Sequence, residues 1–213
     1  MQDFLELLKR GDAAAAEALL ESHPELLTAR NDQGASLLAL SLYHGQPAIA
    51  QLFADRRPLD LWEACMLGNL PRVRDCLDAD PASINLPAPD GFPPFALSVF
   101  FGQPAVYRHL LDRGADVNQP ASNAMRVAAI HAAVSRKDTE GLALLLSRGA
   151  DPNLRQQAGW TALHAAASAG LREIAEALLR AGADRHALTD KGETAASLAL
   201  TAGHLDLAMA LGP

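Results

Sequence analysis

The sequence has few cysteines and few aromatic residues. Of its 213 residues only two are cysteines, Cys65 and Cys76, and both fall at apolar positions of predicted helices. This number excludes a disulfide-rich secreted scaffold, and the spacing matches no cysteine-based metal site. We interpret both as small core residues in a reducing compartment, and we expect no metal or other cofactor. Aromatic residues make up 5% of the chain, so their positions are informative.

Long apolar runs and an excess of basic residues are also missing. No segment approaches the roughly 18 apolar residues of a membrane-spanning helix, and charged residues interrupt the N-terminal stretch where a signal peptide would be apolar. We therefore expect a cytoplasmic protein without a membrane partner. With 18 Lys and Arg against 25 Asp and Glu, the formal net charge is −7. Such a balance does not attract phosphates, so nucleic acid is not an expected partner.

What the sequence does contain is a recurring glycine within a helix–turn–helix pattern. Seven equivalent positions run along the chain, one of them filled by lysine: Gly11, Gly45, Gly68, Gly102, Lys137, Gly170 and Gly203. The intervals are 33 to 35 residues, except for one of 23. A period near 33 is typical of a solenoid, whose units bury their apolar faces only by stacking on neighbours. The pattern predicts one continuous all-α stack of about seven helix pairs.

The unit 159–184 shows the pattern most clearly. Apolar residues three and four apart give each of its two short helices one apolar stripe, and a glycine ends each helix. Its segments TALH (161–164) and GAD (182–184) resemble the Thr-Pro-Leu-His and Gly-Ala-Asp signatures of the ankyrin repeat, and the short, alanine-rich repeats resemble those of bacterial ankyrin proteins. The resemblance extends over 1–213. It implies an ankyrin-repeat solenoid of antiparallel helix pairs, with a short β-hairpin finger at each junction.

On this resemblance the chain is a single ankyrin-repeat domain. In that family a threonine and a histidine bond to each other and to the backbone, which ties down the loop. Thr161 and His164 match this pair, and His131 matches the histidine alone, so we interpret both histidines as structural. The expected repeats are approximately 1–31, 32–57, 58–87, 88–122, 123–155, 156–188 and 189–213.

The N-terminal half contains a second periodicity. The segment ALSLYHGQPA (39–48) recurs as ALSVFFGQPA (96–105) at an offset of 57, which indicates a tandem duplication of 1–57 as 58–114. The short interval of 23 falls at their junction. A full repeat needs roughly 33 residues, so about ten are absent, and we expect one finger to be missing near 57–60. Asp60 and Glu63 are placed there to form a capping box at the start of the next helix.

A partner surface is expected where aromatic and apolar residues gather on the concave side, which is the usual contact surface of ankyrin proteins. The residues just before the recurring glycine are apolar in repeats two to four and polar or small elsewhere, and the fingers add further aromatic and basic residues. The predicted partner-binding residues are Tyr43, His44, Met66, Leu67, Phe92, Phe100, Phe101, Met125, Arg126, Arg136 and Trp160.

Two interpretations of this apolar strip remain open. If it is exposed, its aromatic and arginine residues are the types that dominate interface energies. If the missing finger lets the groove close, Phe100 and Phe101 instead pack against Met66 and Leu67 as core. A monomer rarely leaves such a large apolar patch exposed without a partner, which favours the first interpretation.

No constellation typical of an enzyme is present. The sequence lacks a glycine-rich phosphate loop, a nucleophile elbow and a zinc-type histidine pair. We therefore predict no catalytic residues and a monomeric interaction module or scaffold that binds a protein or peptide in its groove, masking or inhibiting that partner. The alternatives are a small-ligand-binding or catalytic module using the groove near Tyr43, His44 and Phe101, and a chaperone or toxin-neutralising partner.

Overall fold

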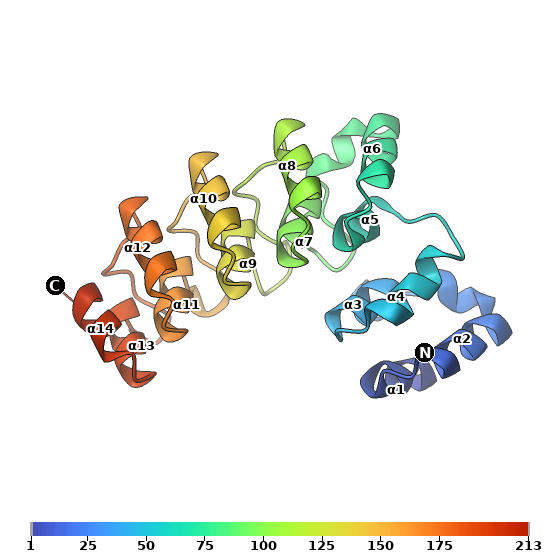
Figure 1. The fold of residues 1–213 in the computed structure, drawn as a ribbon, viewed down its shortest axis with the longest axis horizontal. Coiled ribbons are helices and arrows are strands. Elements are labelled where there is room, and N and C mark those ends of the chain that lie inside the picture. Colours follow the sequence, from blue (N-terminus) through green and yellow to red (C-terminus); the bar gives the residue numbers. More distant parts are fainter. Residues whose placement is uncertain (1, 213) are drawn as a thin grey trace.

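The computed structural model describes residues 2–212, which form short α-helices in antiparallel pairs and three 3₁₀ turns (Figure 1). Seven pairs follow one another along the described chain, as the glycine period predicts. The pairs are α1 Gln2–Arg10 with α2 Ala13–Ser22, α3 Leu37–Tyr43 with α4 Pro47–Ala54, α5 Leu61–Leu67 with α6 Leu70–Ala79, α7 Pro94–Phe100 with α8 Pro104–Asp112, α9 Ala129–Ser135 with α10 Thr139–Ser147, α11 Ala162–Ser168 with α12 Arg172–Arg180, and α13 Ala195–Thr201 with α14 Leu205–Leu211. The 3₁₀ turns are η1 Pro24–Thr28, η2 Pro81–Asn85 and η3 Gln157–Gly159.

The helix bounds of the first half repeat at the predicted offset of 57. The helix α6 lies 57 residues after α2, and the turn η2 lies 57 residues after η1, each with the same length as its counterpart. In both copies a proline, Pro24 or Pro81, begins the 3₁₀ turn directly after the helix, because proline is accommodated at a first helical turn but not within a helix. The two copies therefore share one local structure.

The stack is held by one long core that continues from the first pair to the last. It includes large side chains such as Phe4, Phe53 and Ile130, all without exposed surface, and the alanines of α9 and α11. Alanine at these positions allows neighbouring first helices to approach closely, while leucines and isoleucines of the second helices fill the space behind them. Each pair therefore depends on its neighbours for burial, as expected of a solenoid.

The fingers differ from the predicted β-hairpins. Among residues 2–212 no β-strand is formed, and the only β-type pairing is an isolated bridge between Arg30 and Ser36. Each finger is instead a tight turn whose first and last residues are joined by a backbone hydrogen bond of 2.8–2.9 Å. A turn this short leaves too few residues on either side for a ladder. The five fingers, named here by the residues that this bond closes, are 31–35, 88–92, 121–127, 156–160 and 189–193.

The finger expected to be absent is absent. Only six residues separate the end of α4 at Ala54 from the start of α5 at Leu61. Asp60 caps α5 by accepting a hydrogen bond of 2.8 Å from the Glu63 backbone, and the Glu63 side chain accepts one of 3.2 Å from the Asp60 backbone. The predicted capping box is therefore confirmed. In Figure 1 the first two helix pairs are turned relative to the row formed by the later pairs, and the change of direction falls at this junction.

A buried ion pair ties the junction together. The guanidinium of Arg57 donates two hydrogen bonds, of 2.6 and 2.7 Å, to the two carboxylate oxygens of Glu63, whose side chain is only 3% exposed. Arg57 also donates to the carbonyl of Leu27, and Ser36 donates to Glu63 at 2.8 Å. These contacts join the first three repeats. They satisfy the polar groups that the absent finger leaves at the junction.

Candidate functional site

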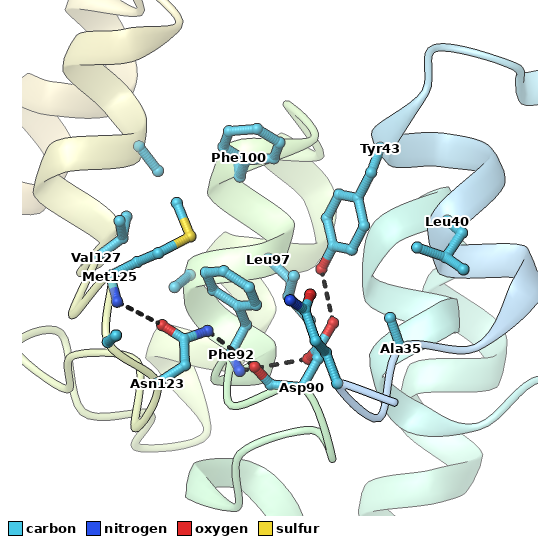
Figure 2. Close-up of a pocket in the computed structure, with 14 residues that line it drawn as sticks. Ala35, Leu40, Tyr43, Asp90, Phe92, Leu97, Phe100, Asn123, Met125 and Val127 are labelled. Atoms are coloured by element: carbon cyan, nitrogen blue, oxygen red, sulfur yellow. Dashed lines mark hydrogen bonds between the residues drawn. The ribbon is translucent and has the colours of Figure 1, made fainter. Parts of the chain in front are cut away.

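A pocket of about 550 Å³ opens between the fingers and the first helices of repeats two, four and five (Figure 2). Its walls come from α3, from the fingers 31–35, 88–92 and 121–127, and from α7 and α9. Most of the lining is apolar, with three polar side chains. The lining residues are Gln33, Ala35, Leu40, Tyr43, Asp90, Phe92, Ala96, Leu97, Phe100, Asn123, Ala124, Met125, Val127 and Ala132. We refer to this site as the finger pocket.

The pocket forms where the finger of repeat two, 31–35, meets the finger of repeat four, 88–92. The two come together because repeat three, which lies between them, has no finger. Gly34 of the first finger lies so close to the finger 88–92 that a Cβ atom at Gly34 would be 2.5 Å from the Pro89 carbonyl oxygen. Gly34 also has a φ of +88°, which favours glycine. The approach aligns the hydroxyl of Tyr43 with Asp90, to which it donates a hydrogen bond of 3.0 Å. Repeat two therefore contacts the finger of repeat four directly.

Three large side chains of the pocket remain accessible. The exposed fractions are 37% for Tyr43, 41% for Phe100 and 48% for Met125. Phe101, which is partly buried, lies behind the two aromatic residues, with its ring 5.7 Å from that of Tyr43 and 5.1 Å from that of Phe100 in an edge-to-face arrangement. The aromatic walls are thus fixed by contacts with one another.

Two of the polar side chains of the pocket, Asp90 and Asn123, are hydrogen-bonded within the protein. Asn123 donates to the Asp90 carbonyl at 2.8 Å and accepts from the Met125 backbone at 3.0 Å (Figure 2). Burial and the neighbouring Asp90 carboxylate raise the pKa of Tyr43 above its ordinary value of 10.0, so its phenol stays protonated and donates to Asp90. These polar groups hold the finger tips in place rather than forming a reactive centre.

The predicted apolar strip divides into an exposed part and a buried part. Met66 was expected at the surface, and that expectation is wrong, because Met66 is 2% exposed and packs with Ala39 and Leu97 in a small separate core. Trp62, Phe92 and Phe101 pack against the same core. Leu67 is partly buried against the main core. Self-packing therefore accounts for Met66 and Leu67, while Tyr43, Phe92 and Phe100 line the open pocket.

The remaining predicted residues lie around the pocket without lining it. His44 is exposed at the end of α3. Arg126 is exposed beside Met125, and Arg136 is exposed and donates a hydrogen bond of 3.0 Å to the Phe100 carbonyl. Trp160 belongs to a neighbouring shallow hollow that Met125 also lines. Whether these residues bind a partner stays a prediction.

Several pocket residues escaped prediction from the sequence. Gln33, Asp90 and Asn123 are finger residues of ordinary turn composition, and Leu40, Leu97 and Val127 follow the same apolar pattern as core residues. The single available signal was their position next to predicted residues, because Asp90 and Asn123 lie two before Phe92 and Met125.

The two histidines interpreted as structural are held by the backbone. Nδ1 of His131 accepts from the Ala128 backbone at 3.1 Å, and Nδ1 of His164 lies 2.9 Å from the Thr161 hydroxyl. The other ring nitrogen of each histidine bonds to a carbonyl 23 residues further along. Burial lowers the pKa of both histidines, which favours the neutral form. This geometry matches the loop-tying role that the resemblance implies.

Residues 2–212 hold no cluster of three or more histidine, cysteine or acidic side chains suited to a metal ion. The same residues form no helix that has both the length and the apolar character to cross a membrane.

Comparison with known proteins agrees with this geometry. Stacked antiparallel helix pairs joined by projecting turns define a helical-repeat solenoid. Residues 130–212 match the family of ankyrin repeats, in three copies. The chain is similar to the ankyrin repeat and SAM domain-containing protein 6 of Rattus norvegicus, with 35% identity over 111 residues, and to that of Mus musculus, with 33% identity over 111 residues. Each match covers 50% of this chain and only 12% of the relative.

Residues 130–212 are ankyrin repeats by this match. The family match covers the C-terminal repeats, and the same helix pairs and stacked turns continue into the N-terminal repeats. Ankyrin repeats generally mediate protein–protein interaction and are typically non-enzymatic.

Proposed function

We propose that this protein acts as a monomeric scaffold that binds a protein or peptide in the finger pocket, masking or inhibiting that partner in the cytoplasm. The observation that carries the proposal is the exposure of Tyr43, Phe100 and Met125 around one apolar pocket. Aromatic side chains in a concave pocket are typical anchors of binding energy. Repeats two, four and five supply the lining of the pocket, so the proposed partner contacts the middle of the stack.

Binding is proposed in preference to catalysis because Tyr43, Asp90 and Asn123 are hydrogen-bonded to one another or to the backbone of the fingers. Asn123 bonds to two backbone groups, and Asp90 accepts the Tyr43 hydroxyl, whose raised pKa keeps the phenol protonated and so a poor nucleophile. The acidic net charge of −7 also makes a nucleic-acid or anionic-membrane partner a poor fit.

The test compares partner capture by the wild-type protein with capture by two pocket variants, Phe100→Ala and Met125→Ala. Met209 provides a matched control, because it is 75% exposed and lies on α14, outside the pocket. Truncating an anchor residue is expected to weaken binding by about 2 kcal/mol, roughly thirtyfold, while Met209→Ala binds as the wild type does. Equal capture by all four proteins would overturn the proposal.

A second candidate function is the binding of an apolar small molecule. The volume of about 550 Å³ supports it, because pockets for small ligands typically span about 300–1,000 Å³. A ligand that binds only the folded protein raises its unfolding temperature. Screening apolar metabolites for a thermal shift that Phe100→Ala abolishes would support this candidate, and a flat response would count against it.

A further inference from the structure

We propose that the segment bound in the finger pocket is an amphipathic helix with one acidic end and one basic end. This inference rests on the proposed binding function and names the chemistry of the partner. Three features of the pocket carry it: its volume, the engaged backbone of the fingers, and the opposite charges at its two ends.

The volume of the pocket favours a helix over a single inserted side chain. At about 550 Å³ the pocket is large enough for a whole ligand, and its walls extend from α3 to α9 across three fingers. An amphipathic helix presents large apolar side chains at positions i, i+3, i+4 and i+7 on one face, as grooves of this kind require. The accessible rings of Tyr43 and Phe100 and the thioether of Met125 form the matching apolar surface.

The backbone of the fingers argues against a bound β-strand. A strand would need free N–H and C=O groups along an edge. In this protein the Gly91 carbonyl accepts from the Ser122 backbone at 2.9 Å, and the Met125 carbonyl accepts from the Gln157 backbone at 2.9 Å. Because neighbouring fingers bond to each other at the pocket, these carbonyls are already paired. A helix, which satisfies its own backbone, needs no such edge.

Charges of opposite sign flank the two ends of the pocket. On the side of repeat two, Asp32 is exposed next to the lining residue Gln33, and Asp90 lies in the wall. On the side of repeat five, Arg126 is exposed next to the lining residue Met125, and Arg136 is exposed beside Phe100. Within residues 2–212 the side chains of Asp32 and Arg126 make no hydrogen bond or ion pair. Complementary charges on a partner would set the orientation of the helix.

The backbone of Arg126 supports a functional role for its side chain. Arg126 has a φ of 52°, in the left-handed region, at the finger position where Gly34, Gly91, Gly159 and Gly192 occur in the other fingers. This conformation is unfavourable for a residue with a side chain, and strain of this kind is common at ligand-binding sites. Arg126 thus places a cation at the rim of the pocket where a glycine would fit the turn better.

The test uses designed helical peptides with identical apolar faces and different ends. One peptide has a glutamate end and a lysine end, a second has lysine at both ends, and a third has glutamate at both ends. Fluorescence anisotropy measures their affinities. The mixed peptide is expected to bind about fivefold more tightly than either uniform peptide, which corresponds to one exposed ion pair of typical strength.

Two charge reversals provide the matched variants. The readout is the affinity of the peptide with glutamate at both ends divided by that of the peptide with lysine at both ends. Asp32→Lys is expected to raise this ratio about fivefold, and Arg126→Glu is expected to lower it about fivefold. Both positions are exposed, so neither substitution removes a core contact. A fourth peptide, with the mixed ends and a central proline that breaks the helix, is expected to lose binding.

The outcomes separate this inference from the proposed function. Equal affinity of the three helical peptides, undiminished binding of the proline peptide, or no binding of any peptide overturns the helix proposal. If peptides bind the wild-type protein but not Phe100→Ala, the finger pocket is their binding site, and the proposed function stands even where the helix proposal fails. If peptides bind but neither Phe100→Ala nor Met125→Ala weakens them, the proposed function fails as well.

Discussion

The hydroxyl of Tyr43 donates a hydrogen bond of 3.0 Å to the carboxylate of Asp90, 47 residues further along the chain. In a regular stack the finger of an intervening repeat would separate these two residues. Here that finger is absent, so the end of α3 contacts the turn that precedes α7. This contact closes one side of the finger pocket and explains why an aromatic pocket forms in the middle of the stack.

Removing this hydroxyl is expected to weaken the contact between repeats two and four. Tyr43→Phe keeps the ring and its packing against Phe101 but loses the hydrogen bond, so the free energy of unfolding is expected to fall by about 1 kcal/mol. Urea unfolding measures the change. Asp90→Asn, which keeps an acceptor for the hydroxyl, is the control and is expected to lose less. An unchanged unfolding midpoint in Tyr43→Phe would contradict a stabilising role.

Gly34 and Gly192 form a matched pair of finger glycines. Both have a positive φ, but a Cβ atom at Gly34 would meet the Pro89 backbone, whereas one at Gly192 would meet no atom within 4 Å. Gly192→Ala is therefore expected to lose about 1 kcal/mol for backbone conformation alone. Gly34→Ala is expected to lose clearly more, because the two fingers must also move apart. Thermal unfolding compares them, and equal losses would show that the close approach is unimportant.

Removing one residue of the buried ion pair Arg57–Glu63 is expected to destabilise the protein more than removing both. Arg57→Met leaves the Glu63 carboxylate buried without its cation, so unfolding free energy is expected to fall by about 3–5 kcal/mol. The double variant Arg57→Met with Glu63→Leu removes both charges and is expected to recover most of that loss. Chemical denaturation of the two variants measures the difference. A double variant no more stable than the single one would contradict this account.

The same pair predicts a loss of stability in acid. Burial alone would raise the pKa of Glu63, but hydrogen bonds from Arg57 and Ser36 outweigh it, and the pKa lies below the ordinary 4.5. A lowered folded-state pKa contributes stability that is present above the unfolded value and is lost as the pH falls through the folded value. The advantage of the wild type over Glu63→Gln is therefore expected to shrink below about pH 4.5. Unfolding measured from pH 7 to pH 3 checks this.

Asp60, at the same junction, has a raised pKa, whereas Glu63 has a lowered one. Burial and the nearby Glu63 carboxylate raise its pKa, so protonation of Asp60 favours the folded state as the pH falls. Because Glu63→Gln also removes part of the cause of the Asp60 shift, the comparison is repeated with Asp60→Asn present in both proteins. A wild-type advantage that grows in acid would show that the sign assigned to Glu63 is wrong.

Truncating Phe100 and Phe53 compares the stability cost of losing an exposed aromatic side chain with that of losing a buried one. Phe53 has no exposed surface, and Phe53→Ala is expected to cost about 3–5 kcal/mol of unfolding free energy. Phe100 is 41% exposed and keeps only part of its contacts in the protein, so Phe100→Ala is expected to cost about 1 kcal/mol. Urea denaturation of both variants measures the costs. A loss in Phe100→Ala as large as that in Phe53→Ala would place Phe100 in the core and remove the main anchor of the proposed site.

Much of the fold followed from spacing along the sequence. The glycine period predicted the helix pairs, the offset of 57 predicted equivalent helix bounds in two copies, and the short interval predicted the missing finger. The capping box at Asp60 was predictable as well, because it needs only residues three apart. The β-hairpins implied by the resemblance were wrong, because the fingers are turns of five to seven residues, too short for strands on either side.

The candidate site was predictable only in part. Tyr43, Phe92, Phe100 and Met125 line the pocket as aromatic and apolar residues near the turns, while Met66, which has the same register as Tyr43 and Phe100, is buried. Periodicity gives equivalent positions the same expected environment, and the missing finger breaks that equivalence at Met66. The closure that buries Met66 also recruits Asp90, which no local pattern distinguishes from other turn residues.

The sequence by itself determined the local structure: where each helix begins and ends, which face of it is apolar, and that the units stack. These features depend on residues a few positions apart, where backbone geometry relates spacing directly to direction. The tertiary structure alone decided which apolar side chains are covered at the irregular junction and which remain open around the finger pocket. That outcome depends on how two fingers 57 residues apart approach each other, and such an approach is set by packing across the stack.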